Sequence, residues 1–268
     1  MAGPSKNGVI TDKRIENPFP GLRPFSIDEA HLFFGRKGQV DEISGSLSDN
    51  HFVAVVGSSG SGKSSLIYCG VIPTLMNGKL KSKTSDWNLV TTRPGNTPLT
   101  NLVRDIKLGL NINEEVSDPA GLFGNNNALL NFMSKSAHKG NVLIMVDQFE
   151  EIFRFGKVLG KSGIKEDPNL YIDFLVHAVK QTEHPIYLVI TMRSDFIGEC
   201  SHFQEFTKLI NQSNYLVPRM TATDFQDVIE GPVRVAGANI DEKLVRKLLE
   251  DIGDNPDQLP VLQHVLMR

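Results

Sequence analysis

The most constraining feature of the sequence is a short apolar run followed directly by a turn of glycine and serine around one lysine. Residues 52–56 are apolar, and residues 57–64 then read GSSGSGKS. Glycines in such a turn allow backbone dihedrals that point successive N–H groups at one centre, which suits an anion. A helix that begins beside the lysine adds its positive end to the same centre. The segment therefore predicts a strand, a phosphate-binding loop and a helix, in that order.

The loop matches the P-loop pattern G-x-x-x-x-G-K-[ST] at every fixed position. We expect the Lys63 ammonium to reach the β- and γ-phosphates of a nucleotide, and the Ser64 hydroxyl to be a ligand of Mg²⁺. The residues expected to bind the nucleotide here are Gly57, Ser58, Ser59, Gly60, Ser61, Gly62, Lys63, Ser64 and Ser65.

A second apolar run supplies the acid that a P-loop enzyme requires. Residues 142–146 lead directly into Asp147, and Glu150 and Glu151 follow closely. The carboxyl end of a buried parallel strand lies where ligands of such folds bind, so we expect Asp147 to hold Mg²⁺, through water. One of the two glutamates is expected to orient or deprotonate the attacking water, with the preference given to Glu151. The other is explained as an acidic residue at a helix start.

An arginine follows a further apolar run, at residues 186–191. Arg193 would lie at the same edge of the sheet, where an arginine can report whether the γ-phosphate is present. The same side chain could instead form an ion pair with Asp195 or a nearby glutamate. The residues alone leave both roles open.

Apolar runs alternate with helical patterns along the middle of the chain. Near-continuous apolar strands separated by helices predict an α/β fold with a parallel sheet covered on both faces. The expected strands are at 52–56, 89–92, 142–146, 186–191 and 215–217, and the expected helices at 64–75, 98–110, 128–137 and 168–181; a surface loop is expected at 124–127.

Composition shifts divide the chain into four expected regions. Residues 1–16 are a flexible lead-in, and 17–50 form an arm with two helices. Residues 51–219 are the NTPase core, and 220–268 are a helical subdomain that ends without a stop signal, as if cut from something longer. The arm at 17–25 contains three prolines and is extended; the helices expected outside the core are at 26–34, 37–47, 221–236, 241–251 and 259–268.

Composition argues against several classes of partner. The 268 residues carry a formal net charge of −3, which makes nucleic acid an unexpected partner, and the basic segment 79–83 is interpreted as a solvated loop. Cys69 and Cys200 lack metal-ligand spacing, so we expect buried thiols in a reducing, cytoplasmic compartment. The chain has no apolar run near the roughly 18 residues of a membrane helix, so no membrane association is expected.

Taken in order, the motifs resemble those of one known family. They are NPFPGLRPF at 17–25, FFGR at 33–36, the P-loop, DQFEE at 147–151, TMRSD at 191–195 and QLPVLQ at 258–263. The set resembles the STAND class, signal-transduction ATPases with numerous domains, and specifically the novel STAND NTPase type 1 family. The resemblance covers residues 17–268, and the arm and DQFEE are its most discriminating parts.

This resemblance implies a sheet order of 5-1-4-3-2 and ATP or ADP with Mg²⁺ as the ligands. It also implies that Gly35 and Arg36 help enclose the adenine, that Pro260 packs on the base from the other side, and that Arg193 senses the γ-phosphate. No residue by itself indicates adenine rather than guanine.

Three positions depart from the pattern of the wider class. Lys37 and Gln39 stand where acidic residues often follow the glycine–arginine pair, so no acidic role is expected there. Gln148 replaces a small residue. Gln258 replaces a common glycine, which leaves the contact of that residue with base or ribose undefined.

The function implied by the resemblance is a slowly hydrolysing regulatory switch. Exchange of ADP for ATP would change its conformation and promote self-association, with sensor and effector domains outside this chain. The alternative is a continuously cycling ATPase motor of another P-loop class. An ABC-type motor would need an LSGGQ-like signature, which the sequence lacks, and an initiator-like ATPase usually appends a basic DNA-binding domain. A small-molecule kinase would need a basic lid, and residues 221–268 are not arginine-rich in that manner.

Overall fold

The structure is a computed structural model that describes residues 17–78, 86–113, 140–156, 167–181, 185–253 and 258–268. Several expectations lie outside the described residues: the lead-in at 1–16, the basic segment at 79–83, the loop at 124–127 and the helix at 128–137.

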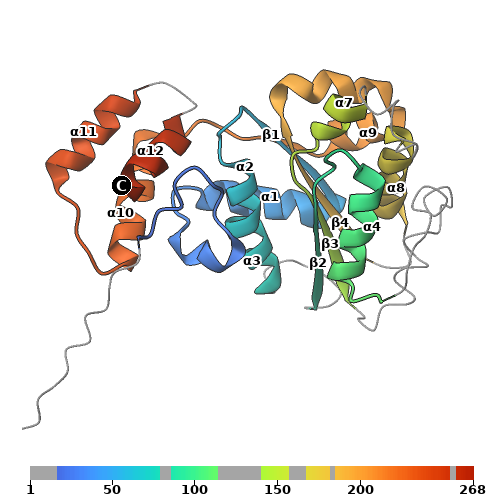
Figure 1. The fold of residues 1–268 in the computed structure, drawn as a ribbon, viewed down its shortest axis with the longest axis horizontal. Helices are drawn as coiled ribbons and strands as arrows, with labels where there is room; N and C mark the ends of the chain where they lie inside the picture. The colour runs from blue at the N-terminus through green and yellow to red at the C-terminus, as the bar shows by residue number, and fades with distance from the viewer. Residues whose placement is uncertain (1–16, 79–85, 114–139, 157–166, 182–184, 254–257) are drawn as a thin grey trace, which may run out of the picture.

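Five parallel strands form a central sheet in the order β2-β3-β4-β1-β5 (Figure 1). The strands are β1 (Phe52–Gly57), β2 (Trp87–Thr92), β3 (Asn141–Val146), β4 (Ile186–Arg193) and β5 (Asn214–Leu216). This is the expected order read from the other edge, and the α/β class is confirmed. The carboxyl ends of β1, β3 and β4 therefore lie next to one another, which brings together the residues that follow them.

Alternate residues of the buried strands face two separate apolar clusters. On β1, Phe52, Ala54 and Val56 pack with one cluster, while Val53 and Val55 pack with the other. The first cluster is covered by α4 (Pro98–Gly109), α7 (Glu151–Gly156), α8 (Pro168–Lys180), the 3-10 helix η3 (Ser194–His202) and α9 (Gln204–Gln212). The second is covered by α1 (Lys37–Asn50), η2 (Leu66–Val71) and α3 (Ile72–Met76), and the short α2 (Lys63–Ser65) leads into η2. Helices thus cover both faces, as the apolar strands predict.

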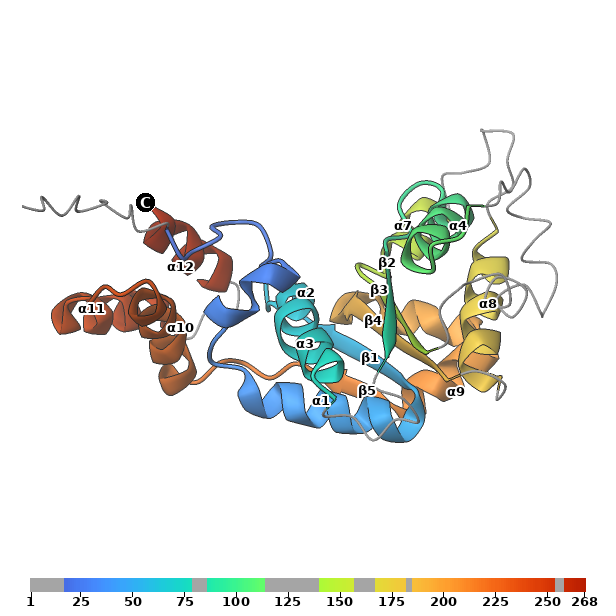
Figure 2. The ribbon, with the colours of Figure 1, turned by 90° about the horizontal axis from the view of Figure 1, so that it is seen from below.

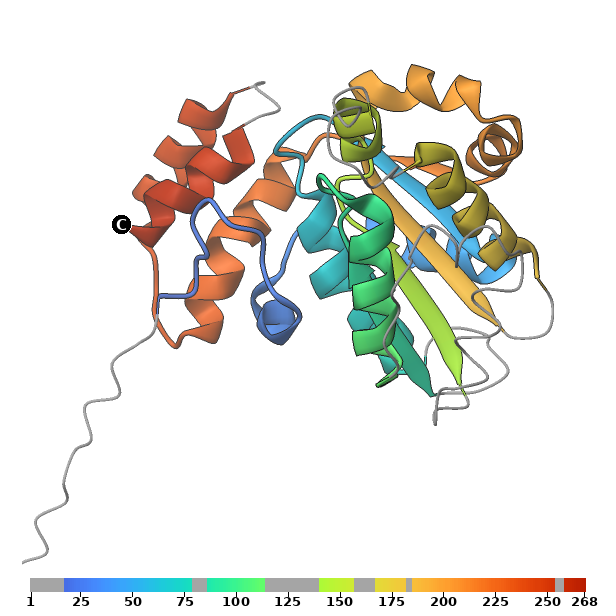
Figure 3. The ribbon, with the colours of Figure 1, turned by 45° about the vertical axis from the view of Figure 1, so that its right-hand side comes forward.

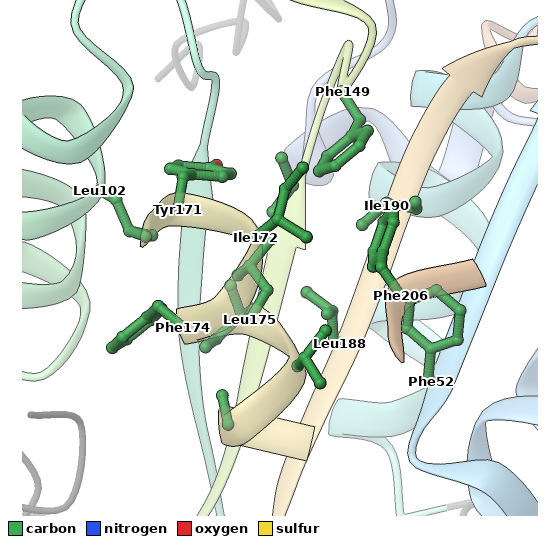
Figure 4. Close-up of a cluster of buried hydrophobic side chains, with 14 of the residues drawn as sticks. Phe52, Leu102, Phe149, Tyr171, Ile172, Phe174, Leu175, Leu188, Ile190 and Phe206 are labelled. Carbon is green, nitrogen blue, oxygen red and sulfur yellow. The ribbon is translucent and has the colours of Figure 1, made fainter. Parts of the chain in front are cut away.

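Aromatic rings fill the first cluster between β1 and α8 (Figure 4). The ring of Phe206 lies 5.0 Å from that of Phe149 and 6.1 Å from that of Phe52, measured between centroids. Phe206, Leu209 and Ile210 are the buried residues of α9, at the i, i+3, i+4 spacing of an amphipathic helix. The sequence analysis assigned no element to this segment, although that spacing was present.

The helix after the P-loop is continuous but not uniform. It was expected as one α-helix over 64–75, and it contains instead a π-helical stretch, η2, between α2 and α3. A Cβ atom on Gly70 of η2 would lie 2.3 Å from Cγ2 of Val40 on α1. A glycine at this position therefore lets the two helices pack closely beneath the P-loop.

Three helices follow the sheet and share an apolar cluster of their own. They are α10 (Ala222–Val235), α11 (Glu242–Ile252) and α12 (Gln258–Met267), close to the ranges expected. Thr221 caps α10 in a capping box with Asp224, and the Asp241 carboxylate accepts hydrogen bonds from Lys243 N and Leu244 N at the start of α11.

The extended arm runs between these three helices and the helix after the P-loop (Figures 2 and 3). At its start, Asn17 Nδ2 donates a hydrogen bond to Met267 O on α12. At its end, Phe25 N donates to Ser65 Oγ at 3.1 Å. The expected helix after the arm is a 3-10 helix, η1 (Ile27–Leu32), which begins with a capping box of Ser26 and Glu29. The arm therefore links α12 to the P-loop.

Among the described residues, no helix combines the length and apolar composition needed to cross a membrane.

Candidate nucleotide site

A cavity of about 410 Å³ lies along the carboxyl ends of the strands. Its walls come from the P-loop, the carboxyl ends of β2, β3 and β4 with the residues that follow them, the arm with η1 and Arg36, and the helical region with α10 and α12. From the P-loop, the lining residues are Ser59, Gly60, Gly62, Lys63, Ser64 and Ser65. The predicted phosphate site is therefore part of a larger concave site.

Lys63 is held against the backbone of its own loop. Its ammonium donates hydrogen bonds to Gly57 O at 3.0 Å and to Ser58 O at 2.6 Å. Burial lowers the pKa of Lys63, and the nearby carboxylates of Glu150 and Asp147 oppose that shift. Ser58 and Ser61 line a neighbouring, smaller cavity of about 100 Å³ and do not line the main one.

Asp147 is fully buried and accepts hydrogen bonds from two hydroxyl groups. Ser64 Oγ donates to Asp147 Oδ1 at 2.6 Å, and Thr191 Oγ1 donates to the same oxygen at 2.7 Å. The two residues predicted to hold Mg²⁺ are thus in direct contact.

The donor set at this contact fits Mg²⁺. The ion prefers oxygen ligands and binds through one or two protein groups together with substrate phosphates. Ser64 lines the cavity, and Asp147, which does not line it, supplies a second oxygen ligand in direct contact with Ser64. Within the described part of the chain, no cluster of three or more His, Cys, Asp or Glu residues could hold a metal by itself. A metal here would therefore depend on phosphate oxygens for its remaining ligands.

Arg93, at the end of β2, is a site residue that the sequence analysis missed. Its Nε and Nη2 both donate to Asp147 Oδ2, at 3.1 Å and 2.5 Å. The side chain is 49% exposed and lines the cavity. Partial burial lowers the pKa of Arg93, but the charge of Asp147 and its hydrogen bonds outweigh this and the pKa is raised. The signal was available, because Arg93 directly follows an apolar strand, as Asp147 does.

The two glutamates after Asp147 point to different neighbours, although both line the cavity. Glu150 is 6% exposed and accepts a hydrogen bond from Arg193 N at 3.3 Å. Glu151 accepts one from Gly95 N at 2.9 Å. Among the nearby charges, that of Glu150 has the largest effect on the pKa of Lys63. The charge of Glu150 thus acts on Lys63 more strongly than that of Glu151, while the catalytic role of either glutamate stays a prediction.

Gln148, the departure noted in the acidic motif, has a left-handed backbone with φ of 57°. Its N–H donates to Thr191 Oγ1 at 3.0 Å. Glycine adopts this conformation without strain, whereas a residue with a Cβ does so at a cost.

Arg193 lines the cavity but its guanidinium is paired with a neighbour. Nε and Nη2 donate to the two oxygens of Asp195 at 3.0 Å and 2.7 Å, and the group lies over the Phe196 ring, 5.6 Å from its centroid. Of the two alternatives from sequence, the ion pair is present. The role of Arg193 toward the γ-phosphate remains a prediction.

Of the three residues expected around the base, two line the cavity and one packs behind its wall. Arg36 and Pro260 line the cavity, and Gly35 does not. Arg36 is 5% exposed and donates to Pro218 O at 2.9 Å and to Ser61 O at 3.3 Å; burial lowers its pKa. Gly35 has φ of 77°, and a Cβ there would lie 2.6 Å from Asp224 O on α10. Arg36 therefore connects the P-loop to the residues after β5 through hydrogen bonds, and Gly35 lets the chain pack closely against α10.

The model of the family described as Novel STAND NTPase 1 matches residues 18–268 of the chain. No curated protein sequence matches it.

Three solved structures illustrate the likeness of the fold. The ORC2 protein of Aeropyrum pernix, in ADPNP–ADP complexes, has a TM-score of 0.58 and 14% identity over 94% of this chain and 65% of its own. The ORC1 protein of Aeropyrum pernix, in complex with DNA, has a TM-score of 0.57 and 12% identity over 86% and 58%. Hsp104 of S. cerevisiae, in a complex with casein, has a TM-score of 0.55 and 11% identity over 88% and 38%.

At such identities the likeness shows the fold alone. The chain spans less than two thirds of the length of each of these proteins.

Proposed function

The chain belongs to the Novel STAND NTPase 1 family, and we propose that it is an ATP-binding, slowly hydrolysing switch. Exchange of ADP for ATP changes its conformation and promotes self-association. One observation carries this proposal: a single cavity is walled by the P-loop, the strand ends, the arm and α12 together. A nucleotide in that cavity would contact parts of the chain that could otherwise move apart.

In this proposal the P-loop and the strand ends hold the triphosphate. Lys63 exchanges its bonds to the carbonyls of Gly57 and Ser58 for bonds to phosphate oxygens, while the loop amides and the start of α2 surround the same phosphates. Ser64 and Asp147 would hold Mg²⁺. When bound, Mg²⁺ neutralises phosphate charge that develops as the terminal phosphate leaves.

For hydrolysis we assign Glu150 to orient and deprotonate the attacking water. Its carboxylate is nearly buried, its charge acts to raise the pKa of Lys63, and it accepts a hydrogen bond from the backbone of Arg193 at the end of β4. Arg193 would exchange Asp195 for the γ-phosphate, which makes its pairing dependent on whether that phosphate is present.

Two contacts could carry the state of the phosphate site to α12. Leu259 of α12 lies against the P-loop, since a Cβ on Gly62 would come within 3.2 Å of Leu259 Cδ2. The arm also runs from Ser65, two residues after Lys63, to Met267 at the far end of α12. A shift of the P-loop would therefore bias the position of α12, as in hinge-type switches.

The proposed boundaries and surroundings follow from the same features. We retain residue 219 as the end of the NTPase core, because α10–α12 have their own apolar cluster. Cys69 and Cys200 are free and buried, which fits the cytoplasm. Sensor and effector domains would lie outside this chain. ORC1 was solved with DNA, but the net charge of −3 makes nucleic acid an unexpected partner here.

The alternative function is a continuously cycling ATPase motor. Hsp104, which shares the fold, was solved with a bound protein, casein. Two measurements on the purified chain separate the two functions: identification of co-purified nucleotide after denaturation, and the rate of ATP turnover. A switch should retain ADP, turn over well below one ATP per second, and grow in size by light scattering when ADP is replaced by a slowly hydrolysed ATP analogue. Sustained turnover on the order of 10 per second, a typical enzyme rate, without bound ADP would favour the motor.

A further inference from the structure

Gln263 is a buried polar side chain of α12, one helical turn after Pro260. It is 7% exposed and lines the main cavity. Its Oε1 is fully buried and has no hydrogen-bond partner among the described residues. A buried carbonyl oxygen without a donor is costly, and such atoms are uncommon in folded proteins. Its place in a cavity wall points to a ligand that supplies the missing donor.

The surroundings of Gln263 differ from those of the phosphate site. The wall formed by the arm, η1, α10 and α12 is mainly apolar: Pro20, Phe25, Phe34, Val228, Leu259 and Pro260 line it. Two arginines also lie there, but each already has partners. Arg23 is paired with Glu29, and Arg36 donates to the carbonyls of Pro218 and Ser61. An apolar wall with one unpaired carboxamide oxygen suits the edge of a flat heteroaromatic ring.

We propose that Gln263 is the residue that selects the base of the nucleotide, and that it selects adenine. Its carboxamide oxygen accepts a hydrogen bond from the 6-amino group, and its NH₂ donates to the adjacent ring nitrogen. A glutamine matches adenine N6 and N7 in this way, whereas guanine presents two acceptors, O6 and N7, on the same edge. The inference rests on the proposed nucleotide site, and it assigns base selection to a residue outside the P-loop and the strand ends.

The test compares three nucleotides: ATP, GTP, and purine riboside triphosphate, which is ATP without the 6-amino group. Each is titrated against the wild-type chain and Gln263→Leu by calorimetry in the presence of Mg²⁺. The wild type should bind ATP about tenfold more tightly than the other two, because one hydrogen bond to a buried group is lost. Gln263→Leu should lose about tenfold in affinity for ATP and keep its affinity for purine riboside triphosphate, so that the preference disappears.

A matched control is Gln226→Leu. Gln226 is exposed on α10, where it donates to Glu230 Oε1, and its replacement should leave all three affinities unchanged. Gln263→Met serves as a second apolar variant if leucine lowers the thermal stability.

The outcomes separate the two proposals. A wild type that binds ATP and purine riboside triphosphate equally overturns the role of Gln263 and leaves the phosphate site intact, whatever the variants do. A folded Gln263 variant that keeps the wild-type preference also overturns it. A wild type that binds none of the three nucleotides overturns the proposed function instead.

Discussion

The Arg93 guanidinium donates two hydrogen bonds to one oxygen of Asp147, while Ser64 and Thr191 donate to the other. The carboxylate is fully buried, and residues from three further segments hold it. A buried charge is tolerated only when it is paired and hydrogen-bonded in this way. Asp147 thus has a fixed position beside the P-loop before any phosphate arrives.

Removing the arginine tests how much this arrangement depends on its counter-charge. Arg93→Ala leaves a buried carboxylate with hydroxyl partners alone, and we expect the free energy of unfolding to fall by about 2 kcal/mol, less than for a fully buried pair because Arg93 is half exposed. Urea unfolding measures the change. Arg104→Ala is the control, since Arg104 is exposed and pairs with its neighbour Asp105; we expect a loss below about 0.5 kcal/mol. Equal losses for the two variants would contradict the structural role of Arg93.

The two glutamates after Asp147 form a matched pair for testing the hydrolytic step. Glu150→Gln should lower kcat by at least about a hundredfold, because it removes the proposed general base, while ATP affinity stays within a few-fold. Glu151→Gln removes the negative charge but keeps an amide oxygen that can accept the hydrogen bond from Gly95 N. Its effect on kcat should therefore be much smaller. Single-turnover hydrolysis with calorimetric binding measures both. A larger loss of kcat for Glu151→Gln than for Glu150→Gln would assign the catalytic role to Glu151 instead.

The capping box at the end of the arm predicts a pH-dependent stability. A hydrogen bond from Arg23 is the main cause that lowers the pKa of Glu29 from 4.5 to about 2, with help from Ser26 N and Oγ. Because the folded pKa is the lower one, the stabilisation is complete above pH 4.5 and is lost as the pH falls toward 2. Glu29→Gln keeps a capping side chain but not the charge, so it should cost about 0.5–1 kcal/mol at pH 7.

Chemical denaturation of wild type and Glu29→Gln at several pH values checks this. The difference between them should shrink between pH 4.5 and 2. Asp28→Asn, on the same turn but exposed, is the control and should follow the wild type. A difference that is the same at pH 7 and pH 2.5 would mean that Glu29 acts through packing and not through its charge.

The strands of the sheet and the contact between Ser64 and Asp147 could be predicted, because the order of apolar runs, P-loop and acid along the chain defines where they lie in this fold. Once residues 52–64 are a strand, a loop and a helix, the fold places the acid after β3 beside them, and Ser64 does contact Asp147. The sheet order came with the family resemblance. The helix after the P-loop was expected, but not its π-helical stretch, which no spacing in residues 64–75 indicates.

The residues that the sequence did not reveal depend on contacts between distant segments. Arg93, like Asp147, directly follows a strand and so lies at the carboxyl edge of the sheet. Its role in holding Asp147 appears only from the contact between the two side chains. Gln263 is an ordinary polar residue in a helical pattern until the arm and α12 enclose it. Likewise, the choice between Glu150 and Glu151 depends on side-chain directions, which the spacing of two adjacent acids cannot define.

The central claim is that the P-loop around Lys63 binds the phosphates of a nucleotide. Lys63→Ala removes the ammonium that would reach the β- and γ-phosphates, and calorimetry with ATP and Mg²⁺ measures the result most directly. We predict a loss of affinity of at least about a hundredfold, the effect of losing two charge-assisted hydrogen bonds. Lys208→Ala, an exposed lysine paired with Glu205 on α9, should bind ATP as the wild type does. A folded Lys63→Ala protein with unchanged ATP affinity would contradict the account.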